Sequence, residues 1–139
     1  MEHFVGTWKL VRFDFEKMKK FYASLGLPAA VLDAPKERWD SLKLEVTGDG
    51  TIWKHCNFPR GDETVTFDLE HGTSTRMGSS GQQTSPQGSF KMEDGVVFTE
   101  ESVGGDKKLT GTKKVDGDDM ILGQTFGDIS VETVFKKCE

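Results

Sequence analysis

The sequence is poor in cysteine, in long apolar runs and in excess positive charge. Its two cysteines, Cys56 and Cys138, lie far apart and lack the paired spacing of a zinc or redox site, so we expect free thiols in a reducing compartment. No window approaches the roughly 20 apolar residues that a membrane-spanning helix needs. The formal net charge of -5 provides no clustered Lys and Arg for a phosphate backbone, which argues against nucleic-acid binding.

Side chains arranged for chemistry are also scarce. The three histidines, His3, His55 and His71, show no metal-ligand spacing. Neither cysteine lies in a context that indicates an activated nucleophile. The acidic pairs Asp118–Asp119 and Glu100–Glu101 alternate in and out along strands or occupy turns, and they are interpreted as solvated surface. We therefore expect no metal site, no cofactor and no enzymatic activity.

What the sequence does contain is a succession of short strands separated by tight turns. Gly and Asp, which tolerate the positive φ of hairpin turns, recur about every ten residues, at 48–50, 93–95, 104–106, 116–118 and 127–128. Between them, apolar and polar residues alternate. The expected strands are 4–13, 41–47, 51–58, 63–70, 89–92, 96–102, 107–115, 120–126 and 129–137, with a weaker one near 73–77.

The number of strands predicts the architecture. About ten antiparallel strands are too many for a flat sheet, and closure removes the exposed edges that promote aggregation. The chain of 139 residues has the size of one domain. We therefore predict a single all-β domain over residues 1–139, a ten-stranded antiparallel up-and-down β-barrel.

One interval shows helical periodicity instead. Its apolar residues fall at spacings of three, four and three, which places them on one helical face: Phe15, Met18, Tyr22 and Leu25. Asp14 is a suitable N-cap, and Gly26 followed by Pro28 ends the helix. A second short helix can start near Pro28 before Pro35 disturbs it. These signals predict a helix-turn-helix lid between the first two strands.

Three features occur together along the chain. They are the opening block Phe-Val-Gly-Thr-Trp-Lys-Leu-Val at 4–11, the helix pair, and the ending Val-Glu-Thr-Val-Phe-Lys-Lys at 131–137. Together they resemble the intracellular lipid-binding proteins, the family of the fatty-acid-binding and cellular retinoid-binding proteins. The resemblance covers essentially the whole chain, and it implies a barrel that holds a hydrophobic ligand in its interior.

The resemblance also implies where a ligand head group lies. The family's Arg on the eighth strand corresponds to Lys113, and its Arg-x-Tyr on the last strand corresponds to Thr133 and Phe135, an ending closer to the retinol-binding branch. Alternation from Thr133 and Phe135 selects Leu122 and Gln124 on the preceding strand. A buried Lys113 ammonium needs an anion or strong acceptors, and a ligand carboxylate would supply one.

Other residues complete the expected site. The resemblance places Trp53 and His55 on the inward face of their strand. Phe15 and Met18 either pack the lid or line the ligand entrance. Trp8 is expected to plug the closed end of the barrel.

We therefore expect a monomeric cytoplasmic carrier of a hydrophobic small molecule, with a long-chain fatty acid as the first candidate. The alternatives are a retinoid or other neutral apolar ligand and, from another class, a haem-binding or ligand-modifying barrel that uses His55. Lys17, Lys19 and Lys20 lie on the outer side of the first helix, where they form either an ordinary solvated face or a contact for an anionic membrane.

Overall fold

Ten antiparallel strands close into a barrel in the computed structural model, which describes residues 1–58, 61–103 and 106–138. Consecutive strands are paired, and β1 completes the ring by pairing with both β2 and β10. The predicted up-and-down barrel is confirmed. The strands are β1 Gly6–Arg12, β2 Lys43–Thr47, β3 Ile52–Cys56, β4 Glu63–Asp68, β5 Thr73–Gly78, β6 Gly88–Glu93, β7 Val96–Ser102, β8 Lys108–Asp116, β9 Asp119–Phe126 and β10 Ile129–Cys138.

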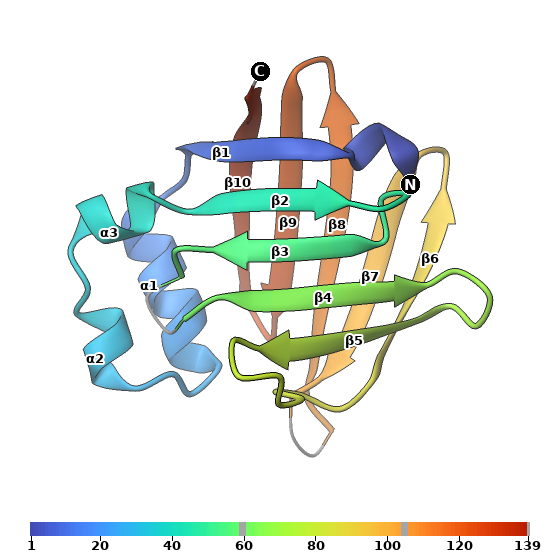
Figure 1. Ribbon diagram of the computed structural model, residues 1–139. Helices are drawn as coiled ribbons and strands as arrows, with labels where there is room; N and C mark the ends of the chain where they lie inside the picture. Colours follow the sequence, from blue (N-terminus) through green and yellow to red (C-terminus); the bar gives the residue numbers. More distant parts are fainter. Residues whose placement is uncertain (59–60, 104–105, 139) are drawn as a thin grey trace.

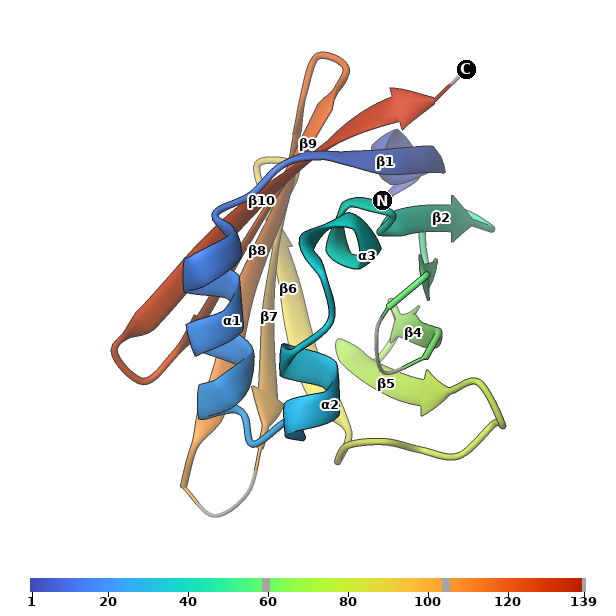
Figure 2. The same cartoon turned by 90° about the vertical axis from the view of Figure 1, so that its left-hand side faces the viewer.

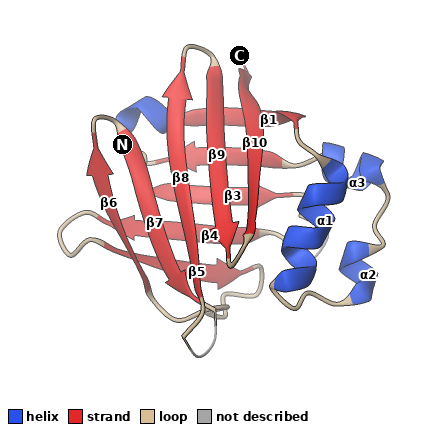
Figure 3. Cartoon of the chain, turned by 180° about the vertical axis from the view of Figure 1, so that it is seen from behind, coloured by secondary structure: helices blue, strands red, loops and turns tan. Residues whose placement is uncertain are grey.

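The barrel is flattened into two layers. Strands β1–β5 lie in front in Figure 1 and cross β6–β10 behind them, and Figure 3 shows the same arrangement from the opposite side. Tight turns hold the second layer together: at the β6–β7 turn, Asp94 and Gly95 have φ of 53° and 79°, a conformation that Asp and Gly tolerate best. The predicted turn residues Gly104 and Gly105 lie outside the described residues.

The connection between β1 and β2 contains helices that lie across one end of the barrel (Figure 2): α1 Phe15–Ser24, α2 Ala29–Leu32 and α3 Lys36–Asp40. The side chain of Asp14 caps α1 by accepting a hydrogen bond from the Lys17 backbone N–H at 3.0 Å. A short 3₁₀ helix, η1 Glu2–Phe4, precedes β1. Within the described ranges, no helix has the length and apolar character required to cross a bilayer.

The lid is more divided than the sequence predicts. Pro35 does not simply disturb the second helix: it is the N-cap residue of α3, where its missing N–H costs nothing. Lys36 Nζ and Asp40 Oδ1 form an i,i+4 ion pair at 3.1 Å along α3. Trp39 is buried and stacks on Tyr22 of α1, with ring centroids 5.3 Å apart, so α3 is fixed to α1.

The end of the barrel opposite the helices is filled by large apolar side chains. Phe4, Trp8 and Trp53 are all at most 1% exposed. The indole N–H of Trp8 donates to the Phe4 carbonyl and that of Trp53 to the Gly50 carbonyl, both at 2.8 Å. Because these indoles satisfy their polar atoms on nearby backbone, they can be fully buried. The predicted role of Trp8 as a plug of this end is confirmed.

One seam of the barrel is much shorter than its neighbours. Strands β4 and β5 pair at six register positions, whereas β5 and β6 pair only at Thr73–Ser89 and Ser74–Gly88. The intervening residues, 79–87, fold back along β5, where the Thr84 N–H donates to the Arg76 carbonyl at 3.0 Å. This segment therefore lies beside β5.

Candidate ligand-binding site

A cavity of about 480 Å³ lies between α1 and the inner faces of the strands. This volume falls in the usual range for small-molecule sites. Most of its wall is apolar and comes from α1, the loop after it, several strands and residues that adjoin strands: Met18, Phe21, Tyr22, Leu25, Leu27, Leu42, Phe58, Val103, Leu109, Leu122 and Phe135. The polar side chains gather on the barrel side, and they include His55, Glu63, Arg76, Glu101, Lys113, Gln124 and Thr133.

The structure brings seven of the nine predicted site residues to this cavity: Met18, His55, Lys113, Leu122, Gln124, Thr133 and Phe135. The other two lie elsewhere. Trp53 lies in the packed closed end, with its ring centroid 5.1 Å from Lys113 Nζ, so it contacts the lysine rather than the cavity. Phe15 packs against Phe13, at a centroid distance of 6.3 Å, and does not line the cavity.

An ion cluster that the sequence analysis did not predict occupies the polar side of the cavity. Arg76 of β5 binds Glu101 of β7 through two hydrogen bonds, Nη2 to Oε1 at 2.9 Å and Nε to Oε2 at 3.2 Å. Its Nη1 also lies 3.4 Å from Oε1 of Glu63 on β4. The three side chains are 16%, 12% and 6% exposed, respectively. The guanidinium thus bridges two buried carboxylates.

The environment keeps both partners of the main pair charged. Burial opposes ionisation of Glu101, but the hydrogen bonds and positive charge of Arg76 outweigh it and lower the pKa of the carboxyl. Burial likewise opposes the charge on Arg76, yet Glu101 and Glu63 raise its pKa further. The hydroxyls of Thr84 and Ser85 donate to Glu63 and Glu101 at 3.3 and 3.4 Å.

The position of Glu101 corrects the interpretation of the acidic pair as solvated surface. Successive residues of a strand face opposite sides, so only one of the two can be outside. Glu100 is outside, with 47% of its side chain exposed and an ion pair to Lys108 at 2.6 Å. Glu101 faces the interior.

Lys113 lines the cavity next to this cluster. Burial, and then the positive charge of Arg76, lower the pKa of its ammonium to about 8, although Glu101 partly opposes the shift. Among the described residues, no carboxylate oxygen lies within ion-pair distance of Lys113 Nζ, whose marked contact is the face of Trp53. Lys113 is therefore a cavity cation that contacts an aromatic ring and that the charge of Arg76 destabilises more than the charge of Glu101 stabilises.

The cavity opens beside the lid. Three of its lining residues are exposed to solvent, Thr84, Pro86 and Val103, and Leu25 and Leu27 are partly exposed. The mouth thus lies between the C-terminal end of α1, residues 79–87 and the end of β7. Figure 2 shows α1 and α2 on this side of the barrel.

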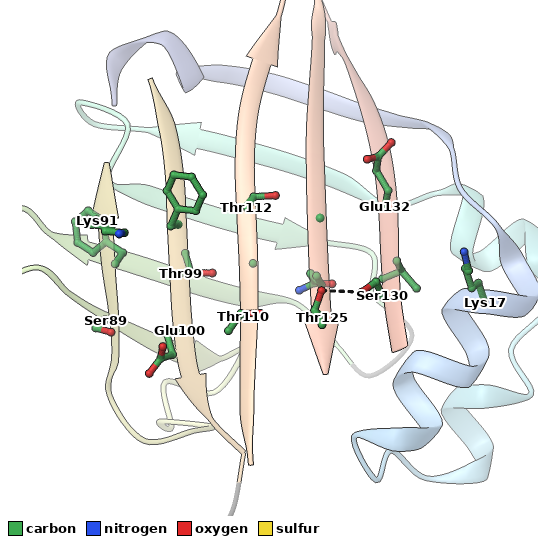
Figure 4. A pocket seen from close by; sticks show the side chains of 16 residues that line it. Lys17, Ser89, Lys91, Thr99, Glu100, Thr110, Thr112, Thr125, Ser130 and Glu132 are labelled. Atoms are coloured by element: carbon green, nitrogen blue, oxygen red, sulfur yellow. Dashed lines mark hydrogen bonds between the residues drawn. The ribbon is translucent and has the colours of Figure 1, made fainter. Parts of the chain in front are cut away.

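A second hollow, of about 660 Å³, lies on the solvent-facing side of β6–β10 (Figure 4). Hydroxyl and charged side chains dominate it, including Thr110, Thr112 and Glu132. Thr125 and Ser130 hydrogen-bond to each other across β9 and β10 at 2.8 Å. Its large apolar side chains are Phe90, Phe98 and Val131, fewer than line the interior cavity, so the interior cavity is the better candidate for a hydrophobic ligand.

The barrel with its helical lid defines a fold class, and solved structures with this fold are known. The chain is similar to lipid binding protein 8 of Caenorhabditis elegans, with 15% identity, a TM-score of 0.74 and coverage of 99% of this chain and 97% of that one. It is also similar to fatty-acid-binding protein 1 of Echinococcus granulosus, with 19% identity, a TM-score of 0.67 and complete coverage of both chains.

A third structure widens the comparison. The abundant heat soluble (SAHS) protein of Ramazzottius varieornatus has 19% identity and a TM-score of 0.68, and the match covers 99% of this chain and 97% of that one. No protein-family model and no curated protein sequence matches the chain. The chain therefore has the fold of the lipid-binding proteins, as its opening block and helix pair predict, and its function has to be argued from the cavity.

Proposed function

We propose that this chain reversibly binds a hydrophobic small molecule in the barrel cavity and carries it without reacting with it. The cavity itself is the main support: its wall is largely apolar, and a few polar groups converge at one side. Two structures with the same fold are named as lipid-binding and fatty-acid-binding proteins. A carrier in the cytoplasm, which we propose to be monomeric, agrees in its location with the two free cysteines, Cys56 and Cys138.

The head group of the ligand is the finer part of the proposal. A long-chain fatty acid is the candidate that the sequence favours, because Lys113 offers a cation to a carboxylate. A retinoid or another neutral apolar ligand is the second. This second candidate is favoured by the engagement of Arg76, which already binds two carboxylates of the chain itself.

We propose that movement of the lid accompanies ligand exchange. Met18, Tyr22 and Leu25 of α1 line the cavity beside its mouth, so separation of this helix face from the rim would widen the entrance. Lys17 and Lys20 are exposed, and Lys19 lies over the ring of Phe15 at 5.3 Å. We propose that these three lysines touch anionic membranes transiently during exchange.

Blocking the cavity tests the proposed function. Leu122→Trp would fill the interior, whereas Ile121→Trp adds the same side chain on the outer face of the same strand. Native mass spectrometry of the purified proteins, followed by ligand extraction, should show a bound apolar molecule in wild type and in Ile121→Trp. Leu122→Trp should lose it. Equal occupancy in the two variants, or no lipid binding in wild type, would contradict a carrier function.

A further inference from the structure

Charged side chains of both signs line the cavity. In the part of the chain that the structure describes, its wall contains two carboxylates, Glu63 and Glu101, two cationic side chains, Arg76 and Lys113, and the imidazole of His55. The four charged groups come from four strands, β4, β5, β7 and β8, and the closure of the barrel brings them together. With Lys113 protonated and the imidazole neutral, the charges sum to zero.

Little of this positive charge is available to a ligand. The edge of the Arg76 guanidinium that could grip a carboxylate with two parallel bonds, formed by Nε and Nη2, is taken by Glu101. The remaining Nη1 lies against Glu63. A ligand carboxylate therefore cannot form a two-bond pair with Arg76 unless one of these internal pairs breaks.

A ligand carboxylate would also add a third negative charge to a desolvated group of four. Lys113 alone could face it, while Glu101 and Glu63 would repel it. A neutral head group meets no such repulsion. A hydroxyl or amide can donate a hydrogen bond to a cluster carboxylate and accept one from Lys113 or Gln124, both of which line the same cavity.

We propose that the charged cluster Glu63–Arg76–Glu101, next to Lys113, makes this cavity select an apolar chain with a neutral, hydrogen-bonding head group, an alcohol or an amide, over the matching carboxylate. This inference rests on the proposed function, because it assigns a ligand class to the same cavity. It assigns to the two carboxylates the role of specificity residues, whose negative charge excludes acids.

The test compares two ligands with the same chain. Lauric acid and lauryl alcohol are titrated at neutral pH against wild type loaded with Nile red, an uncharged apolar dye, and displacement is followed by fluorescence. Because an ionised acid enters any apolar pocket less readily than an alcohol, the readout is the change in the acid-to-alcohol affinity ratio between variants. Glu101→Gln removes one repelling charge and leaves one acceptor in place of two on this edge of Arg76, so one guanidinium N–H becomes available.

We expect Glu101→Gln to raise this ratio by about tenfold or more, the effect of gaining one charge-assisted hydrogen bond. Glu100→Gln makes the same change on the outer face of β7, where the side chain pairs with Lys108, and it should leave the ratio at the wild-type value. Glu63→Gln provides a second interior variant if Glu101→Gln unfolds, as judged by circular dichroism. It should shift the ratio in the same direction.

The outcomes separate the two proposals. An acid that binds wild type more tightly than the alcohol, or a ratio that neither interior variant changes, overturns the neutral-ligand inference but leaves a carrier function standing. If neither ligand nor dye binds wild type, the proposed function itself fails.

Discussion

The two ends of the barrel are built from the same strands, but one end is packed solid and the other contains a cavity. At the closed end, inward side chains are large and apolar, and Phe4, Trp8 and Trp53 leave almost no exposed surface. Toward the lid, inward positions of neighbouring strands carry Glu63, Arg76 and other polar groups around an open cavity. Because strand alternation fixes only which residues face inward, their size and charge decide whether the interior becomes core or site.

Trp53 joins the two ends. Its ring lies 5.2 Å from that of Phe4 and 6.1 Å from that of Phe67, within the packed core. The same ring lies 5.1 Å from Lys113 Nζ. The packed core therefore contacts the cavity cation. The residues that stabilise the fold and the residues that contact a ligand are neighbours, but they are different residues.

The largest expected effect is at the closed end. Trp8→Ala removes a side chain that is 1% exposed and should lower the free energy of unfolding by about 3–5 kcal/mol, because the cavity it leaves cannot refill. Urea denaturation measures this. Phe98→Ala, on the outer face at 36% exposure, should cost far less. Equal losses would show that the closed end is not the main source of stability.

We expect an effect of intermediate size from Lys113, on the way the free energy of unfolding depends on pH. Its pKa is about 8 in the folded chain and near 10.5 when unfolded. Between these values the unfolded state binds more protons, so the free energy of unfolding should rise with pH by roughly 3 kcal/mol from this residue. Urea denaturation of the ligand-free protein at a series of pH values checks this.

Other groups titrate in the same range, so the measurement needs a matched pair of variants. Lys113→Met should abolish this part of the rise, whereas Lys114→Met, which changes an exposed neighbour on the same strand, should retain it. If both variants keep the rise, Lys113 is not desolvated in the apo protein.

The smallest effect concerns the lid. Asp14→Ala removes the N-cap of α1 and should cost about 1 kcal/mol, because the Lys17 backbone N–H loses its acceptor. Since α1 also covers the cavity, ligand release measured by stopped-flow fluorescence should become faster. Asp14→Asn, which can still accept that bond, is the control. Unchanged release in Asp14→Ala would argue against α1 as the gate.

The fold could be predicted almost completely from local signals. Turn pairs such as Asp94 and Gly95 mark where strands end, and the spacing of Met18 and Tyr22 marks α1. The third helix was missed because Pro35 was interpreted as a disruption, although proline is equally suited to begin a helix. An acidic residue in the first turn, Glu37, was the available signal for α3.

The site could be predicted only in part. Lys113 and Thr133 were found through the resemblance, but Arg76 lies in a polar stretch with no apolar alternation to indicate which side faces inward. The inward position of its partner Glu63 was easier to predict, because Glu63 has the same strand parity as Val65 and Phe67, which are both buried. Charge pairing between distant strands depends on barrel closure, and no local pattern encodes it.

The short seam between β5 and β6 has a consequence for how this architecture can vary. Residues 79–87 are bounded by only two paired positions, so lengthening this segment would disturb little of the ladder. Loop entropy grows slowly, with about 0.6 kcal/mol for each doubling of length. Because the same segment contributes Thr84, Ser85 and Pro86 to the cavity, insertions there could remodel the entrance while the other nine seams keep their register.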